Sequence, residues 1–154
     1  MPVNLTPYNE LCFAVYTTNR YFHKLYHLVL HPFGLTYLQY MVLLIVYRQQ
    51  TTTISQVCSE LDMANNTLTP VVQKLVQKNW LLKQRAPEDV RRFNLSFNPA
   101  QNAQFNLLQT KIAKIQQLFI HQVAAPPITE MINQQHQLNQ QLKELAQQLE
   151  KQPL

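Results

Sequence analysis

The stretch that decides the fold is residues 51–97, TTTISQVCSELDMANNTLTPVVQKLVQKNWLLKQRAPEDVRRFNLSF. In its first half, apolar residues recur every three or four positions, which predicts a short helix over 54–62 and a longer one from residue 65 or 66. Met63-Ala64-Asn65 forms the tight turn between them, and Asn65 or Asn66 is expected to cap the second helix. After Asn79 the period changes to two, which predicts strands over 80–85 and 92–97 joined by a hairpin loop over 86–91.

The flanking sequence predicts further helices. One runs from Tyr8 to Leu30 and is ended by the segment 31–34, where Gly34 supplies a left-handed cap. Thr36 caps the next, strongly apolar helix, and Asn98-Pro99 starts another that runs to Val123. The last helix covers Thr129 to Glu150 after Pro126-Pro127. Its heptad-like seam is typical of a helix that packs against a partner, and consists of Leu138, Leu142, Leu145 and Leu149.

A helix-turn-helix followed by a two-stranded hairpin is a winged helix-turn-helix. We therefore expect a mainly α (α+β) chain with a winged helix-turn-helix DNA-binding domain over 35–97. Residues 1–34 and 98–154 are expected to form a helical dimerisation region, so that the protein is a homodimer. In such folds the second helix of the pair enters the major groove of DNA and the hairpin contacts the backbone or the minor groove.

The charge distribution agrees with a nucleic-acid partner. The 154-residue chain carries a net charge of +5, and residues 65–95 hold six basic and two acidic side chains, a balance of +4 within one fifth of the sequence. A solvated charged face is the alternative explanation for such a segment. The candidate DNA-binding residues on the helix are Asn65, Asn66, Thr67, Thr69, Lys74 and Lys78, and those on the hairpin are Arg85, Asp89, Arg91 and Arg92.

Three short motifs resemble the MarR family of regulators, and most closely its organic-hydroperoxide-resistance regulators. They are Leu35-Thr36-Tyr37-Leu38-Gln39-Tyr40, Asn66-Thr67-Leu68-Thr69-Pro70 and Pro87-Glu88-Asp89-Val90-Arg91. The segment Leu11-Cys12-Phe13-Ala14-Val15-Tyr16 resembles the one that carries that subfamily's reactive cysteine. The chain departs from the family pattern at Ala64-Asn65-Asn66, where Asp-Ser-Gly is usual, and at Asn79, where a glycine is usual.

The resemblance implies that Cys12 senses peroxide and that tyrosines hold it by hydrogen bonds, their counterparts here being Tyr16, Tyr26 and Tyr37. Cys12 lies near the start of the first helix, where the helix dipole favours a thiolate. Tyr26 is 14 residues further on, about 21 Å along a straight helix, so it is expected to come from the other subunit, as is Tyr37. Two-cysteine relatives have a second cysteine in the C-terminal helices, which here contain none, so this is a one-cysteine switch. Oxidised Cys12 is then expected to form a mixed disulfide with a small cellular thiol or to over-oxidise.

The resemblance also implies a repressor that releases a pseudo-palindromic operator when Cys12 is oxidised. Cys12 can alternatively be a buried small hydrophobe, and Cys58 is expected to pack in the core beside Ile54, Val57 and Leu61.

Two other kinds of regulator remain open. A small aromatic ligand could act as the signal, in a pocket lined by Phe13, Tyr21, Phe22, Phe33 and Tyr40. A metal sensor could use His23 and His27, with His31 one turn beyond, although zinc sites need three or four protein ligands.

An enzyme is not expected, because the sequence has no Gly-rich phosphate loop, nucleophile elbow or paired-carboxylate motif. No cofactor is expected. The sequence has no apolar run of about 20 residues and no signal-peptide pattern, so a cytoplasmic protein without a membrane partner is expected.

Overall fold

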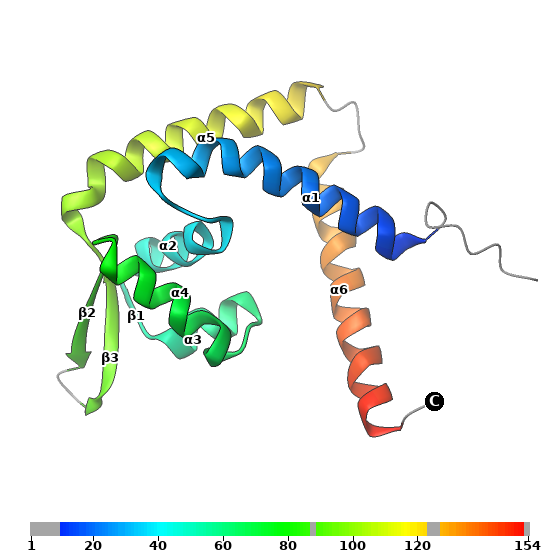
Figure 1. Cartoon of the computed structure of the whole chain (residues 1–154). Helices are drawn as coiled ribbons and strands as arrows, with labels where there is room; N and C mark the ends of the chain where they lie inside the picture. The colour runs from blue at the N-terminus through cyan, green and yellow to red at the C-terminus, as the bar shows by residue number, and fades with distance from the viewer. Residues whose placement is uncertain (1–9, 87–88, 123–126, 153–154) are drawn as a thin grey trace, which may run out of the picture. The chain divides into compact units, whose positions relative to one another are not determined.

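The structure, a computed structural model, describes residues 10–86, 89–122 and 127–152, and no side chains of residues 89–91. It divides into two compact units, Met1–Ala113 and Lys114–Leu154. The winged helix-turn-helix lies in the first unit (Figure 1), and the expected mainly α class is confirmed. The elements are α1 (Leu11–Leu30), η2 (His31–Phe33), α2 (Tyr37–Gln49), β1 (Thr51–Thr52), α3 (Ile54–Leu61), α4 (Asn65–Gln77), β2 (Leu81–Ala86), β3 (Asp89–Phe97), η3 (Pro99–Gln101), α5 (Asn102–Gln122) and α6 (Ile128–Lys151).

Local capping residues set most helix boundaries. Thr36 and Thr53 each close a capping box, in which the threonine side chain accepts from the backbone N–H three residues on and a glutamine side chain accepts from the threonine N–H. Gly34 takes the left-handed conformation at φ 66° and ends η2. Asn79, at φ 60°, takes the same conformation just after α4, as expected from an asparagine in place of glycine.

The sheet has one strand more than the sequence predicts. Thr51 and Thr52 form β1, which pairs antiparallel with β3 in the order β1-β3-β2, with Thr52 opposite Leu95. The two-residue strand has no periodicity of its own, and its partner is more than 40 residues along the chain. β3 begins at Asp89, earlier than the expected Arg92, and Ala86 pairs with Asp89 across a bulge.

The core of the first unit lies among α2, α3, α4 and the sheet. Tyr47 of α2, Phe97 of β3 and Phe105 of α5 pack their rings with centroids 4.8 to 5.1 Å apart, which joins the start of α5 to the winged helix. The fully buried side chains include Leu30, Val42, Leu43, Val46, Val57, Leu68, Leu75, Leu81, Leu95, Phe105 and Leu108.

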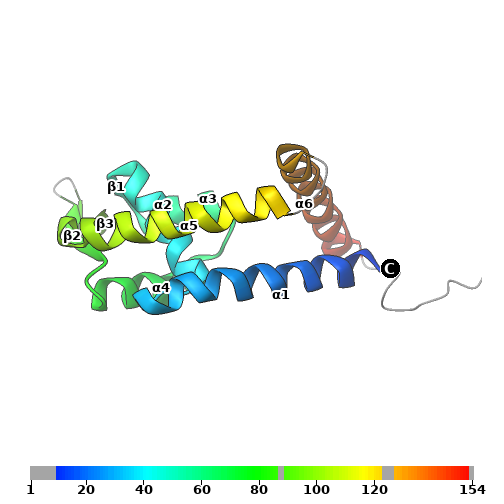
Figure 2. The same cartoon turned by 90° about the horizontal axis from the view of Figure 1, so that it is seen from above.

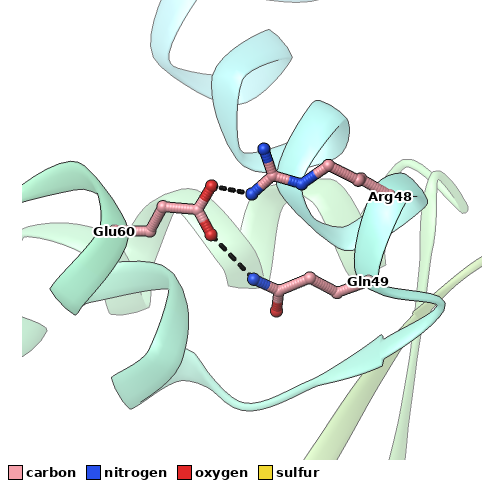
Figure 3. A network of polar contacts seen from close by, with 3 residues as sticks. All are labelled: Arg48, Gln49 and Glu60. Carbon is pink, nitrogen blue, oxygen red and sulfur yellow. Dashed lines mark hydrogen bonds and ion pairs between the residues drawn. The ribbon is translucent and has the colours of Figure 1, made fainter.

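A polar network also ties α2 to α3 at the surface. The Glu60 carboxylate accepts a hydrogen bond from Gln49 Nε2 at 2.7 Å and pairs with the Arg48 guanidinium (Figure 3). Because Arg48 is 67% exposed, water screens this ion pair and it adds little stability.

The long helices expose most of their apolar residues. α1 runs outward from the core as one continuous helix (Figure 2), and Leu30 is its only buried residue. α6 has no buried residue, and Leu142, Leu145 and Leu149 of its predicted seam are exposed. Among the described residues no single helix is long and apolar enough to cross a membrane, and only the pair α1–α2, bent by 70°, reaches that composition together.

Candidate functional site

The first turn of α4 carries the polar side chains predicted to read DNA. Asn65, Asn66 and Thr67 are exposed, and Thr69 is partly exposed. The expected asparagine cap is wrong, because Ala64 occupies the cap position and Asn65 is already helical. Asn65 cannot turn back to cap the helix, since its Oδ1 accepts a hydrogen bond from the Cys58 thiol at 3.1 Å.

The two threonines of this turn make local hydrogen bonds. Thr69 Oγ1 donates to the Asn65 carbonyl at 2.7 Å, so its single proton is used inside the helix and its oxygen remains an acceptor. Thr67 Oγ1 donates to Asn66 Oδ1 at 3.4 Å. Asn65 and Asn66 are therefore the side chains of this turn that can donate to DNA through their amide groups.

The two lysines at the C-terminal end of α4, Lys74 within the helix and Lys78 at its C-cap, differ. Lys74 is exposed in the last turn. The Lys78 ammonium donates to the Gly34 carbonyl and, at 3.4 Å, to Gln39 Oε1, the oxygen that also accepts from Thr36 N–H. Lys78 thus braces the start of α2, a role that its position in the sequence did not reveal.

The wing, the β2–β3 hairpin, faces the start of α3 across a cavity of about 520 Å³. Lys83 and Arg92 line the cavity from the wing, and the Lys83 ammonium lies 4.4 Å from the centre of the Phe93 ring. Thr53 and the first residues of α3 line the opposite side, where the helix dipole is positive. The cavity is therefore suited to an anion such as a DNA phosphate.

Among the other wing residues, Arg85 is exposed. The side chains of Asp89 and Arg91 lie outside the described part of the structure, so their expected pairing stays a prediction.

Cys12 is the second residue of α1, two positions after the helix N-cap Glu10, and its side chain is exposed. The expected position at the start of the helix is confirmed, and within a single chain the alternative of a buried hydrophobe is wrong. Tyr16, one turn further, is 58% exposed, with the Arg20 guanidinium 5.9 Å from the centre of its ring.

Tyr26 and Tyr37 meet at the opposite end of α1. Their ring centroids are 4.8 Å apart in an edge-to-face arrangement, and the His23 ring lies 5.7 Å from that of Tyr37. A cavity of about 240 Å³ opens here, lined by both tyrosines together with Asn19, Phe22 and His23. Of the aromatic residues expected to line a ligand pocket, only Phe22 does so. The sequence missed Asn19 and His23, although both lie one turn apart on the face of α1 that carries Tyr26.

Burial keeps the neighbouring phenols neutral. It raises the pKa of Tyr37 above its usual value of 10.0, with a smaller contribution from Tyr26. It raises the pKa of Tyr40 to about 12, with smaller contributions from Tyr26 and Tyr37. Tyr40 Oη donates to Gln109 Oε1 of α5 at 3.4 Å. Tyr37 and Tyr40 therefore keep their O–H donors well above neutral pH.

The remaining candidates are Cys58 and the histidines. Cys58 belongs to the hydrophobic core, as expected. His27 and His31 lie with ring centroids 4.9 Å apart, whereas His23 packs on Tyr37. Within residues 10–86, 89–122 and 127–152, no three His, Cys, Asp or Glu side chains are grouped so that they could hold a metal ion.

Comparison with known proteins identifies the family. The model of the transcriptional regulators SarA/Rot matches residues 24–108, which include α2, the helix-turn-helix and the wing. The chain belongs to this family of transcriptional regulators. The expectation that it is not an enzyme is thereby confirmed. The match begins at residue 24, after Cys12, so membership of the family does not tell whether the Cys12 thiol is a sensor.

The chain is also similar to individual transcriptional regulators. It is 32% identical over 88 residues to the organic hydroperoxide resistance transcriptional regulator of Bacillus subtilis (strain 168), a match that covers 57% of this chain and 60% of that protein. It is 31% identical over 87 residues to the regulator SarZ of Staphylococcus epidermidis, covering 56% and 59%. The matched part thus spans about 60% of the length of these relatives.

Among solved structures, reduced AbfR bound to DNA superimposes with a TM-score of 0.75 at 30% identity, covering 90% of this chain and 93% of AbfR. These likenesses confirm the resemblance to organic-hydroperoxide-resistance regulators that the motifs predicted.

Proposed function

We propose that this SarA/Rot-family protein binds double-stranded operator DNA as a homodimer and releases it when Cys12 is oxidised. The observations that carry the DNA-binding part are the basic cavity between the wing and the start of α3 and the exposed polar residues of the first turn of α4. AbfR, similar over 90% of this chain, is seen bound to DNA. The site of action is the cytoplasm, where both DNA and small thiols are found.

Salt dependence tests which side chains contact phosphate. Each phosphate contact that is lost lowers the slope of log K against log salt concentration by about 0.9. Arg85→Gln and Lys74→Gln are each expected to lower the slope by that amount, because both residues are exposed on the α4 and wing surface. Lys114→Gln, also exposed but on α5, is the control and should leave the slope unchanged. An unchanged slope for either variant would remove that residue from the interface.

The sensing part of the proposal rests on the exposed Cys12 thiol at the start of α1. The Cys12 thiolate attacks the terminal oxygen of an organic hydroperoxide and the O–O bond breaks, which gives a sulfenic acid on Cys12 and an alkoxide that takes up a proton from water to become an alcohol. The sulfenic acid then condenses with a small cellular thiol, which forms a mixed disulfide and releases water.

The cavity at Tyr26 and Tyr37 can be part of the Cys12 site only if Cys12 of one chain contacts the cavity of a second chain. Tyr26 lies about 21 Å along α1 from Cys12 of the same chain, so the two cannot touch within one continuous helix. If two α1 helices pair antiparallel about a twofold axis near Asn19, midway between residues 12 and 26, Cys12 of each chain reaches Tyr26 of the other. The exposed apolar residues of α1 supply the surface for this pairing; they include Leu11, Val15, Phe22 and Leu25.

A site shared by two chains couples oxidation to DNA binding. Two half-sites of a palindromic operator are about 34 Å apart, and the two α4 helices must match that spacing. Oxidation of Cys12 changes the contacts between the paired α1 helices and so biases the dimer away from that spacing. A coupling of about 3 kcal/mol would weaken operator binding about 150-fold.

Binding measurements with and without cumene hydroperoxide test this proposal. We expect wild-type protein to lose affinity for DNA on oxidation and Cys12→Ser to keep it. After treatment with hydroperoxide together with a small thiol such as cysteine, intact mass should show a thiol adduct on wild type and none on Cys12→Ser. Cys58→Ser is the control for the second thiol, and hydroperoxide should lower its affinity for DNA, relative to its own value before oxidation, by the same factor as for wild type. A Cys12→Ser protein that is released as readily as wild type would overturn the sensing role.

A mixing experiment tests whether the site spans two chains. Cys12→Ser and Tyr26→Phe chains are refolded together, so that the mixed dimer contains one site with both Cys12 and Tyr26 only if these come from different chains. We expect the mixed dimer to regain about half of the wild-type oxidation rate, with Tyr21→Phe, an exposed tyrosine of the same helix, as the control for Tyr26→Phe. No recovery would place Tyr26 outside the site of the partner's cysteine.

A second candidate signal is a small aromatic ligand. The 240 Å³ cavity at Tyr26 and Tyr37 is large enough for a single phenolic ring, and Asn19 and His23 could bind a polar substituent. If salicylate releases DNA from Cys12→Ser protein while hydroperoxide has no effect on wild type, the ligand explanation replaces oxidation.

A further inference from the structure

Cys58 organises the turn between α3 and α4 through both its backbone and its side chain. The Cys58 carbonyl accepts hydrogen bonds from Asp62 N–H and Met63 N–H, which close α3 as Asp62 turns left-handed at φ 52°. Its thiol donates to Oδ1 of Asn65, the first residue of α4, across a sulfur–oxygen distance of 3.1 Å. One residue of α3 thus holds both the end of its own helix and the first side chain of the next.

The thiol bond fixes which end of the Asn65 carboxamide faces outward. A thiol is a donor and an amide oxygen is the stronger available acceptor, so the oxygen turns toward the sulfur. The Nδ2 group lies on the other side of the planar amide and therefore points away from Cys58. Because Cys58 is only 7% exposed while Asn65 is exposed, the oxygen faces the core and the two N–H donors face solvent.

We propose that Cys58 is a positioning residue for DNA reading, whose thiol presents the Asn65 amide group as a hydrogen-bond donor to the DNA. This inference rests on the proposed DNA binding. Donors suit phosphate oxygens and the N7 and O6 acceptors of purines, and a carboxamide locked in this orientation cannot accept from a base amino group. Cys58 therefore acts on sequence preference through Asn65, without contacting the DNA.

The test begins with DNA duplexes that wild-type protein selects from a random pool. If no duplex is selected, the proposed function fails before this inference is tested. With a selected duplex, Asn65→Asp retains an oxygen for the Cys58 thiol and replaces the outward donors by a negative oxygen. We expect Asn65→Asp to bind at least about tenfold more weakly than Asn65→Ala. Equal or tighter binding by Asn65→Asp would overturn the orientation.

A double-mutant cycle tests whether Cys58 acts through Asn65. Freed from the thiol, the Asn65 side chain populates several rotamers, so Cys58→Ala is expected to lower affinity about three- to fivefold, in proportion to the competent fraction. In the Asn65→Ala background the same change should have no effect on affinity. An equal loss in both backgrounds would mean that Cys58 merely supports the fold and would overturn the proposal.

Two further variants separate positioning from packing. Cys58→Ser keeps a donor at the same place and should retain more of the wild-type base preference than Cys58→Ala, measured by repeating the selection. Ser59→Ala, on the exposed neighbour in α3, is the matched control and should bind like wild type. If Cys58→Ala and wild type select the same bases with the same affinity, Cys58 has no positioning role.

Discussion

The winged helix and the long helices at the two ends of the chain use apolar residues in different ways. In α2, α3 and α4 the apolar faces are closed by the same chain, and Val42, Val57 and Leu68 have no exposed surface. In α1 and α6 the periodicity is as regular, yet Leu28 is 66% exposed and Leu142 is 54% exposed. Regular apolar spacing therefore predicts that a helix buries a face, while only the structure tells whether its own chain covers it. The open faces of α1 and α6 suit a second copy of the chain.

The largest expected effect comes from truncating a leucine of the closed core. Leu68→Ala leaves a cavity between packed helices and is expected to lower the free energy of unfolding by about 2 to 5 kcal/mol, whatever the protein concentration. Leu28→Ala is the matched control on α1, and its effect should be small in dilute protein and grow with concentration. Urea unfolding of the two variants and wild type at two protein concentrations measures both effects on the free energy of unfolding. Equal effects at low concentration would remove the distinction between the two regions.

The next effect tests the open face of α6. Leu142 and Leu145 are each about half exposed, so a partner would remove roughly the other half of their surface from water. Leu142→Glu with Leu145→Glu is therefore expected to weaken dimerisation by at least about 2 kcal/mol, or roughly thirtyfold in Kd, measured by sedimentation. Gln137→Glu with Gln147→Glu adds the same charge away from the seam and should leave Kd nearly unchanged. If both pairs behave alike, the seam is not an interface.

The smallest effect concerns Tyr40, a buried residue of α2. At pH 7, Tyr40→Phe removes the hydrogen bond to Gln109 and should cost about 1 kcal/mol of unfolding free energy. Because the folded pKa is about 12 and the usual value is 10.0, the unfolded state loses its proton first. Wild-type protein therefore loses stability as the pH rises above 10, by about 1.4 kcal/mol at pH 11.

Tyr40→Phe has no such loss, so the two proteins should become nearly equal in stability at pH 11. Urea unfolding at pH 7 and pH 11 tests this, with Tyr21→Phe, 65% exposed, as the control that shows no difference at either pH. A constant gap between wild type and Tyr40→Phe would contradict the raised pKa.

What could be predicted from sequence follows from the range of the interactions. Thr36, Gly34 and Asn98 act on backbone groups within a few residues, so their caps were predicted correctly. The Asn65 or Asn66 cap was wrong because a buried thiol on another helix competes for the Asn65 oxygen. β1 was missed because a two-residue strand exists only through its pairing with β3.

The sequence by itself determined the order of helices and hairpin, the concentration of positive charge on α4 and the wing, and the place of Cys12 at the start of a helix. Each of these depends on local periodicity, local capping or composition. Only the tertiary structure decided that Tyr26 and Tyr37 share a cavity, that Lys78 braces Gly34, and that Cys58 orients Asn65. These contacts join residues from different elements, and their geometry depends on how the whole core packs.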